Sequence, residues 1–193
     1  MGFLSTLYKG LCHFNSALLL IGRQLAWMCV ALMTLIILLQ VFYRYGLNNA
    51  LPWPEEAARA LMIWMTALAA PTAYRHGGFV SIDMLQGYLP SLLRSILIIT
   101  LLVIAGAVLI KLFELAINFF ERGFRTYTAS IRLPWDPTEK LKRAWVYLAM
   151  PVCFGGMLLV NIELLIREIG IRLGREEDFP APVQPKALAP QEA

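Results

Sequence analysis

The sequence predicts an all-α membrane protein with four transmembrane helices and an amphipathic helix at the N-terminus. Its 193 residues are 59% apolar and 16% charged, with a mean hydropathy of +0.62, whereas soluble domains carry about 45–50% apolar and about 25% charged residues. Charged residues divide the chain into four long uncharged runs. None of these runs shows the alternating polarity over about ten residues that a membrane β-barrel strand would have.

The charge balance and the cysteines exclude several other classes of protein. Seventeen Lys and Arg against thirteen Asp and Glu give a net charge of +4, which is too small and too dispersed for a nucleic-acid surface. No nucleic-acid partner is therefore expected. Cys12, Cys29 and Cys153 are odd in number and have no short pairing, so we interpret them as small apolar residues rather than a disulfide framework or a zinc site.

Residues 1–22 form the predicted amphipathic helix, which lies on the membrane surface and leads into the first span. One face carries apolar side chains at spacings of three and four residues: Phe3, Leu4, Leu7, Leu11, Phe14 and Leu18. Lys9, His13 and Asn15 lie on the opposite, polar face. The apolar stretch that follows is too long for a cleaved signal peptide, so we expect an uncleaved membrane anchor.

The membrane domain is predicted to cover residues 23–173. We place its four spans at about residues 24–43, 57–75, 91–117 and 144–166. The first and last uncharged runs are long enough to cross a hydrocarbon layer of about 30 Å. The two middle runs are shorter, so we expect Arg59 and Arg75 to extend from the second span toward the lipid head groups.

Prolines and acidic residues mark the predicted helix starts. Pro54, Glu55 and Glu56 begin the second span, because proline suits the first helical position and carboxylates favour the positive end of the helix dipole. The run Asp136-Pro137-Thr138-Glu139 predicts a polar helix that leads into the fourth span. The proline-rich residues 174–193 are predicted to form a disordered tail, which the family resemblance described below would place in the cytoplasm.

A polar cluster lies where the first two spans meet. It comprises Arg44, Trp53, Glu55, Glu56, Arg59 and Trp64. Glu55 and Arg59 are four residues apart, so we expect them to form an ion pair on one helix face. Glu56 points elsewhere and needs a cation, either Arg44 or a partner chain, because an unpaired buried carboxylate costs several kcal/mol, by order of magnitude.

The spans offer few groups for chemistry of their own. His13 and His76 lie in flanking segments, so we expect neither haem nor another cofactor in this chain. Apart from the possible intramembrane pair Lys111 and Glu114, the centres of the spans are uncharged, whereas autonomous transporters keep ionisable groups or broken helices there. A supporting role for another polypeptide is favoured. The alternative is a self-sufficient homo-oligomeric transporter or channel with Lys111 and Glu114 in its pathway.

Several motifs resemble the DctQ-type small membrane subunit of tripartite ATP-independent periplasmic (TRAP) transporters. They are Arg44-Tyr45, Trp53-x-Glu55-Glu56-x-x-Arg59, Trp64, Ala73-Tyr74-Arg75, Val80-x-Ile82-Asp83, Thr128 to Trp135 and Tyr147 to Phe154. The similarity covers residues 23–167. Phe79 stands where the family often has a histidine.

The resemblance implies a multi-pass protein of the bacterial inner membrane, with both termini cytoplasmic and no enzymatic activity. It would form part of a fixed frame, in contact with lipids, for a large permease that holds the substrate and sodium sites. A periplasmic binding protein would deliver an organic acid to that permease. An ion gradient would drive the uptake of the acid. On this topology Glu55, Glu56 and Arg59 lie at the periplasmic edge, where they either brace the first two helices or contact the binding protein. The charge pattern itself does not decide the orientation, because Lys and Arg divide evenly between the two sides.

Overall fold

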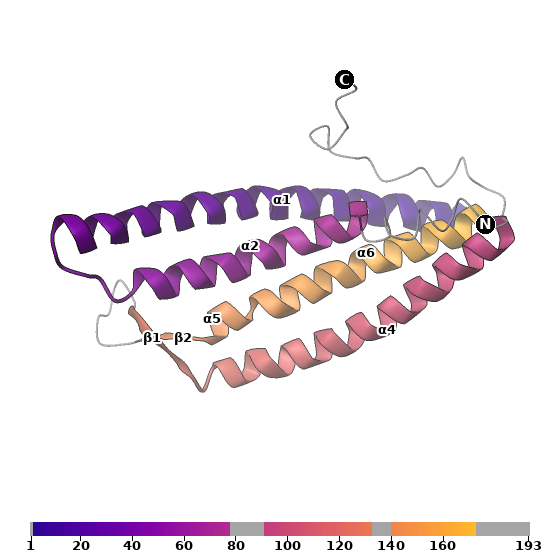
Figure 1. Cartoon of the computed structure of the whole chain (residues 1–193). Coiled ribbons are helices and arrows are strands. Elements are labelled where there is room, and N and C mark those ends of the chain that lie inside the picture. The colour runs from indigo at the N-terminus through magenta and orange to yellow at the C-terminus, as the bar shows by residue number, and fades with distance from the viewer. Residues whose placement is uncertain (1, 78–90, 133–139, 173–193) are drawn as a thin grey trace, which may run out of the picture.

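The computed structural model of the chain is an elongated helical bundle (Figure 1). It describes residues 2–77, 91–132 and 140–172. In chain order the elements are α1 (Gly2–Val41), the π-helix η1 (Phe42–Gly46), α2 (Pro54–Gly77), α4 (Ser91–Gly123), β1 (Tyr127–Arg132), β2 (Lys140–Lys142), α5 (Ala144–Tyr147) and α6 (Ala149–Arg172). The predicted disordered tail, 174–193, lies outside the described residues.

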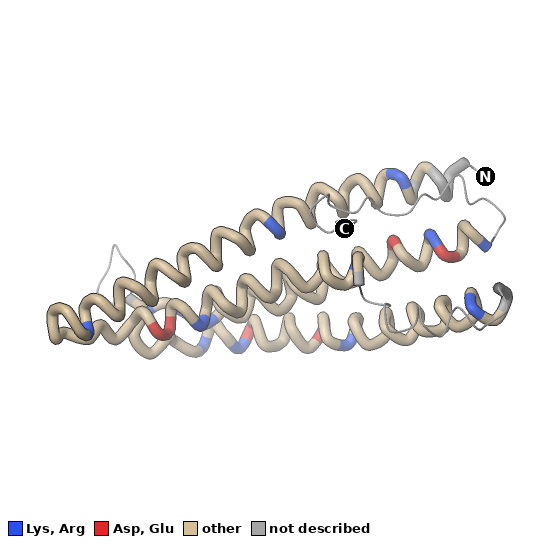
Figure 2. Tube along the Cα trace, turned by 45° about the horizontal axis from the view of Figure 1, so that its top comes forward, with Lys and Arg blue, Asp and Glu red and all other residues tan. Residues whose placement is uncertain are grey.

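The long helices pack in the order α1, α2, α6 and α4. Helix α2 contacts both α1 and α6, and α4 contacts α6. The start of α2, the two strands and α5 lie at one end of the bundle, whereas the start of α1 and the end of α6 lie at the other (Figure 1). Charged residues are sparse along the helices and leave long uncharged stretches between them (Figure 2). The helix packing therefore places Glu55, Glu56 and Arg59, at the start of α2, toward one end of the bundle and Arg75, near the end of α2, toward the other.

Three helical segments are long and apolar enough to cross a membrane. They are Tyr8–Gly46, Leu93–Gly123 and Ala144–Arg172, and they coincide with three of the four predicted spans. The chain is thus mostly helical and crosses the membrane more than once. Helix α2 has 24 residues but is less apolar than α1, α4 and α6, and it does not meet the same condition.

Helix α1 is continuous over 40 residues. The sequence predicted a surface helix over residues 1–22 that leads into a span, but the helix shows no break between the two segments. Tyr8 and Asn15 are both about 1% exposed, although Asn15 was expected on the polar face. Because Asn15 donates hydrogen bonds to Leu159 and Glu163 of α6, it lies inside the bundle rather than at the membrane surface.

The all-α prediction is wrong in the connection between α4 and α5. Strands β1 and β2 pair antiparallel, with Tyr127 opposite Lys142 and Arg132 opposite Lys140. The buried Thr128 hydroxyl lies 2.9 Å from the carbonyl oxygens of both Ile131 and Leu141, which share its single proton as acceptors. We expected a polar helix from residue 136, but Lys140–Lys142 is a strand; residues 133–139 lie outside the described part of the chain.

Glycines allow α6 and its neighbours to approach closely. A Cβ added at Gly156 would lie 2.9 Å from Cγ of Pro71 on α2, and one added at Gly106 on α4 would lie 2.9 Å from Oδ1 of Asn161. Both distances are shorter than ordinary van der Waals contacts. Small residues at helix crossings are a common means of close packing in membrane proteins, and here they bring α2 and α4 close to α6.

Candidate functional site

A buried ion pair joins α2 to α6. The side chains of Arg75 and Glu163 are only 2% and 1% exposed. Nε of Arg75 donates to Oε1 of Glu163 at 3.1 Å, and Nη2 donates to the same oxygen. Burial of either charge without its partner would be strongly unfavourable. The pair therefore fixes the position of α2 along α6.

Helix α1 supplies further partners for both charged groups. Nδ2 of Asn15 donates to Oε2 of Glu163 at 2.7 Å. Nη1 of Arg75 donates to the hydroxyl of Ser16 at 2.9 Å, and Nη2 donates to the thiol sulfur of Cys12 at 3.3 Å. We call these five residues the buried cluster. It connects α1, α2 and α6 near the end of the bundle where the chain begins.

The buried cluster corrects two expectations. Arg75 does not extend toward lipid head groups, because α1 and α6 provide its hydrogen-bond partners. Cys12, interpreted as a small apolar residue, accepts a hydrogen bond from a charged group. Glu163 was not among the residues predicted from the sequence. Its position in the last turns of the fourth predicted span, at the same end of the bundle as Arg75, was the available signal.

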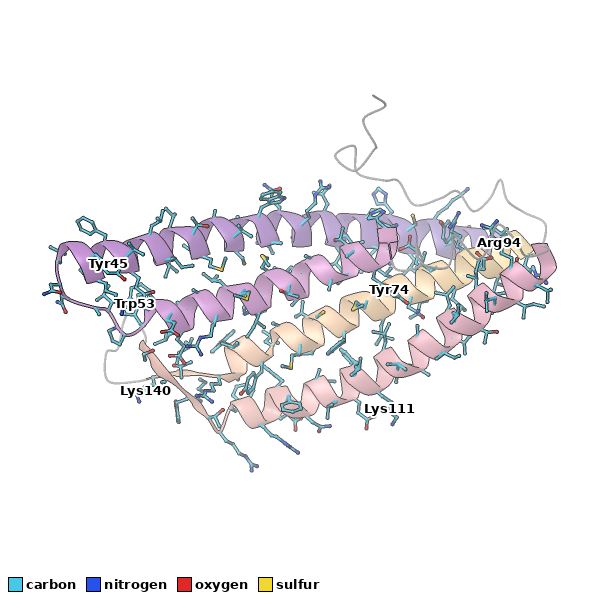
Figure 3. All side chains as sticks on the ribbon, viewed as in Figure 1. Tyr45, Trp53, Tyr74, Arg94, Lys111 and Lys140 are labelled. Carbon is cyan, nitrogen blue, oxygen red and sulfur yellow. The ribbon has the colours of Figure 1, made fainter. Side chains whose placement is uncertain are left out.

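A second buried polar contact involves Asn161, which is 4% exposed. Its Nδ2 donates to the hydroxyl of Tyr74 at 2.7 Å and to the carbonyl of Leu102 at 3.3 Å. Tyr74 extends from α2 (Figure 3) and directly precedes Arg75. Adjacent residues of α2 thus bind two residues of α6, and Asn161 also links α4 to the other helices.

At the opposite end of the bundle, Glu56 binds strand β1. The Ala129 amide donates to Oε1 of Glu56 at 2.9 Å, and the amide and hydroxyl of Ser130 each donate to Oε2 at 2.7 Å. Desolvation raises the pKa of Glu56, but these hydrogen bonds to the ionised form outweigh it and lower the pKa to about 2. Glu56 is therefore a carboxylate at neutral pH and fastens α2 to β1.

Arg44 does not supply the cation that we expected for the Glu56 carboxylate. Its carboxylate oxygens accept hydrogen bonds from β1, while the Arg44 guanidinium lies 5.8 Å from the centre of the Tyr45 ring. The expected cation is replaced by amide and hydroxyl groups. Such groups satisfy an ionised carboxylate without a countercharge.

The remaining predicted residues of this cluster lie around the start of α2. The predicted pair of Glu55 and Arg59 is confirmed at 2.6 Å, with side chains 70% and 69% exposed. Nε1 of Trp64 donates to the carbonyl of Trp145 in α5 at 3.2 Å. The carbonyl of Trp53 accepts from the Ala57 amide at 3.0 Å, in the first turn of α2. The indole of Trp64 thus adds a direct link between α2 and α5.

The predicted ion pair on α4 lies apart from both clusters. Lys111 and Glu114 form the expected ion pair on α4 at 3.0 Å, with side chains 81% and 63% exposed. Asp83 lies outside the described residues. The structure therefore brings Arg75 together with Glu163, and Glu56 together with β1, and leaves the pair on α4 at the surface.

Residues 33–170 match the family model described as tripartite ATP-independent periplasmic transporters, DctQ component. The chain is also 34% identical over 92 residues to a protein of Haemophilus influenzae that is named as a TRAP transporter small permease protein. The alignment covers 46% of this chain and 53% of the relative. The chain thus spans about half the length of the curated relative that it matches.

Proposed function

Because the chain belongs to the DctQ family, the small membrane subunits of TRAP transporters, we propose that it supports a large permease in the ion-gradient-driven uptake of an organic acid. A periplasmic binding protein delivers the acid, and the substrate and sodium sites lie in the permease. In this proposal the small subunit is part of the fixed frame. It has neither a catalytic group nor a cofactor of its own.

The buried cluster is the observation that supports this role. Arg75 and Glu163 are almost completely buried, and their hydrogen bonds go to each other and to residues of α1. A charged pair with internal partners from three helices holds those helices in one arrangement, because separation of the helices would leave buried charges unpaired. Such a bundle suits a frame against which another domain moves.

We propose that α2 is the fourth membrane span. Its 24 residues correspond to about 36 Å, which exceeds the hydrocarbon thickness of about 30 Å. The helix lies between α1 and α6 along the bundle. Arg75 lowers the hydropathy of α2, but Glu163 pairs with it inside the bundle. Four spans place both termini on one side, which is the cytoplasmic side of a bacterial inner membrane in this proposal.

We favour a bracing role for the cluster at the start of α2. Glu56 connects α2 to β1, and Trp64 connects α2 to α5. Both contacts hold together the end of the bundle that would face the periplasm. The alternative is contact with the binding protein, for which the exposed pair of Glu55 and Arg59 is available.

Reconstitution into liposomes tests the proposed function. We expect uptake of the organic acid down a sodium gradient when this chain, the large permease and the binding protein are all present. Liposomes with this chain alone should show no flux. Transport by the purified chain alone would overturn the supporting role and establish the homo-oligomeric transporter or channel instead.

A further inference from the structure

A cavity of about 370 Å³ lies between α1 and α2 and is open along one side. Trp27 and Val30 of α1 and Met65 and Ala69 of α2 line its apolar part. Its volume falls within the range of about 300–1,000 Å³ that is usual for ligand pockets. Trp27 and Ala69 are exposed, so the cavity faces outward from the bundle, toward lipid when α1 and α2 cross a membrane. We call it the α1–α2 groove.

The polar residues of the α1–α2 groove gather at one end. Because α1 and α2 run in opposite directions, Arg23 and His76 lie at the same end, whereas Val30 and Met65 lie at the other. Arg23, Thr72 and His76 also line an adjoining cavity of about 210 Å³, which borders the buried cluster. Both cationic side chains are half-buried. The groove thus combines a long apolar part with a positively charged end.

The polar groups at this end have unused hydrogen-bonding capacity. Thr34, Thr66 and Thr100 each donate to the carbonyl four residues earlier, at 2.9, 2.9 and 2.8 Å. The Thr72 hydroxyl is buried and has no hydrogen-bond partner among the described residues. None of the ion pairs within the described part of the chain includes Arg23. In this structure the end of the groove therefore offers an anion both a cation and a hydroxyl donor.

The polar end lies at the edge of the hydrocarbon layer when α2 crosses it. From Pro54, where α2 begins, to Thr72 is 18 residues, or about 27 Å, which is close to the hydrocarbon thickness of about 30 Å. Arg23 directly precedes the first predicted span, and His76 directly follows the second. From His76 back to Met65 is 11 residues, or about 16 Å. The groove therefore extends through about half of the layer, which is the depth of one leaflet.

We propose that the α1–α2 groove binds one phospholipid with an anionic head group. An acyl chain lies along the apolar part. The phosphate accepts hydrogen bonds from the Arg23 guanidinium, whose donors match phosphate oxygens in pairs, and from the Thr72 hydroxyl. His76 supplies a further donor. Basic pockets between membrane helices are typical sites for anionic head groups. The inference goes beyond the proposed function, because it requires only that α1 and α2 cross the membrane together.

A transmembrane helix is too wide to occupy the groove. A helix with its side chains is about 10–12 Å across, so a length of about 16 Å occupies roughly 1,300–1,800 Å³, several times the groove volume of about 370 Å³. A single acyl chain is narrower and flexible. Charge also favours a phospholipid, because an apolar occupant would leave Arg23 without a partner at the edge of the hydrocarbon layer.

Native mass spectrometry of the purified full chain tests the head-group part of the proposal. The probes are phosphatidylglycerol, which is anionic, and phosphatidylcholine with the same acyl chains, which has no net charge. We expect the wild type to bind one phosphatidylglycerol about tenfold more tightly, which is the effect of one hydrogen bond between charged groups. Arg23→Gln should remove this preference. The matched control is Arg94→Gln, which removes an exposed arginine of α4 toward the same end of the bundle (Figure 3) and should retain it.

A second pair of variants tests the acyl-chain part. Ala69→Trp fills the groove and should weaken the binding of both lipids. Ala107→Trp makes the same change at an exposed position of α4 and should not. Thermal unfolding of each variant verifies that the fold is intact. Equal affinity of the wild type for the two lipids, or a preference that survives Arg23→Gln, would overturn the proposal.

Photo-crosslinking in cell membranes identifies the occupant of the groove. A photoreactive residue at Ala69 should give a higher yield of phospholipid adducts than one at Ala107, which measures the background from bulk lipid. Equal yields at the two positions, or adducts with the permease or with a second copy of this chain, would overturn the proposal. The proposed function is tested separately by uptake in liposomes, so either result here leaves it standing.

Discussion

Arg75 shows how the surroundings of a single residue change its role. In the sequence it stands near the end of an apolar run, where a long cationic side chain usually reaches the membrane surface. In the folded chain, Glu163 and Ser16 provide its partners. A residue that would have marked the edge of a span instead holds helices together, because three helices meet at its position.

Removal of one charge from the buried cluster should destabilise the protein more than removal of both. We expect Arg75→Met to lower the free energy of unfolding by about 3–5 kcal/mol, because Glu163 is left buried without a cation. Combination with Glu163→Leu should recover most of this loss, since no buried charge remains. Chemical unfolding in detergent micelles measures the free energy of unfolding of both variants and of the wild type. Equal destabilisation by the single and double variants would contradict the role assigned to the pair.

The bond between Glu56 and β1 predicts a defined dependence on pH. The folded pKa of Glu56 is about 2 and its ordinary value is 4.5, so the ionised form stabilises the folded state above pH 4.5 and this contribution disappears as the pH falls toward 2. Wild type should therefore exceed Glu56→Gln in stability by a constant amount from pH 7 to pH 5. The difference should shrink below pH 4.5, as measured by unfolding of both proteins. A difference already absent at pH 5 would contradict the assigned contact.

The local ion pairs could be predicted from the sequence, whereas the long-range contacts could not. The two members of each local pair are three or four residues apart, as in Lys111 with Glu114 and Glu55 with Arg59. Helix geometry alone brings side chains at these spacings together. Glu56 and Ser130 are separated by 74 positions. Their contact depends on where β1 lies relative to α2, which helical spacing does not determine.

At the scale of the elements, uncharged runs located the long helices because a membrane-spanning helix has a required length. The same rule did not find the hairpin. Strand β1 contains aromatic and β-branched residues, Tyr127, Thr128 and Ile131, which are typical of strands. These residues are few and lie outside the apolar runs, so hydropathy alone did not distinguish a short hairpin from a loop.

The close crossing of α2 and α6 should be sensitive to one added methyl group. Gly156→Ala would place a Cβ 2.9 Å from the rigid ring of Pro71, so we expect a loss of about 1–3 kcal/mol in stability. Gly10→Ala is the matched control, because an added Cβ there meets no atom within 4 Å and alanine favours a helix by about 0.5–1 kcal/mol. Thermal unfolding in one detergent compares them. Similar stability changes for both variants would argue against a tight crossing.

At the scale of the whole molecule, the number of spans determines where each connection lies. If α2 crosses the membrane, Asn48 and Arg125 lie on one side, and Thr6 and Arg172 lie on the other. If α2 does not cross, Arg125 shares a side with Thr6. Single cysteines at these positions, in a chain without Cys12, Cys29 and Cys153, can be labelled from outside intact cells. We expect labelling at Asn48 and Arg125 only.

The length of α1 has a consequence for the surrounding lipid. Its apolar segment, Tyr8–Gly46, has 39 residues and measures about 58 Å, nearly twice the hydrocarbon thickness of about 30 Å. An upright helix of that length would expose several apolar turns to water, so the helix must stand obliquely or the bilayer around it must thicken. The shorter α2, about 36 Å long, packs along α1, so part of α1 extends beyond the hydrocarbon layer when α2 crosses it. In the proposed complex, uptake should therefore be greatest in bilayers of one preferred acyl-chain length.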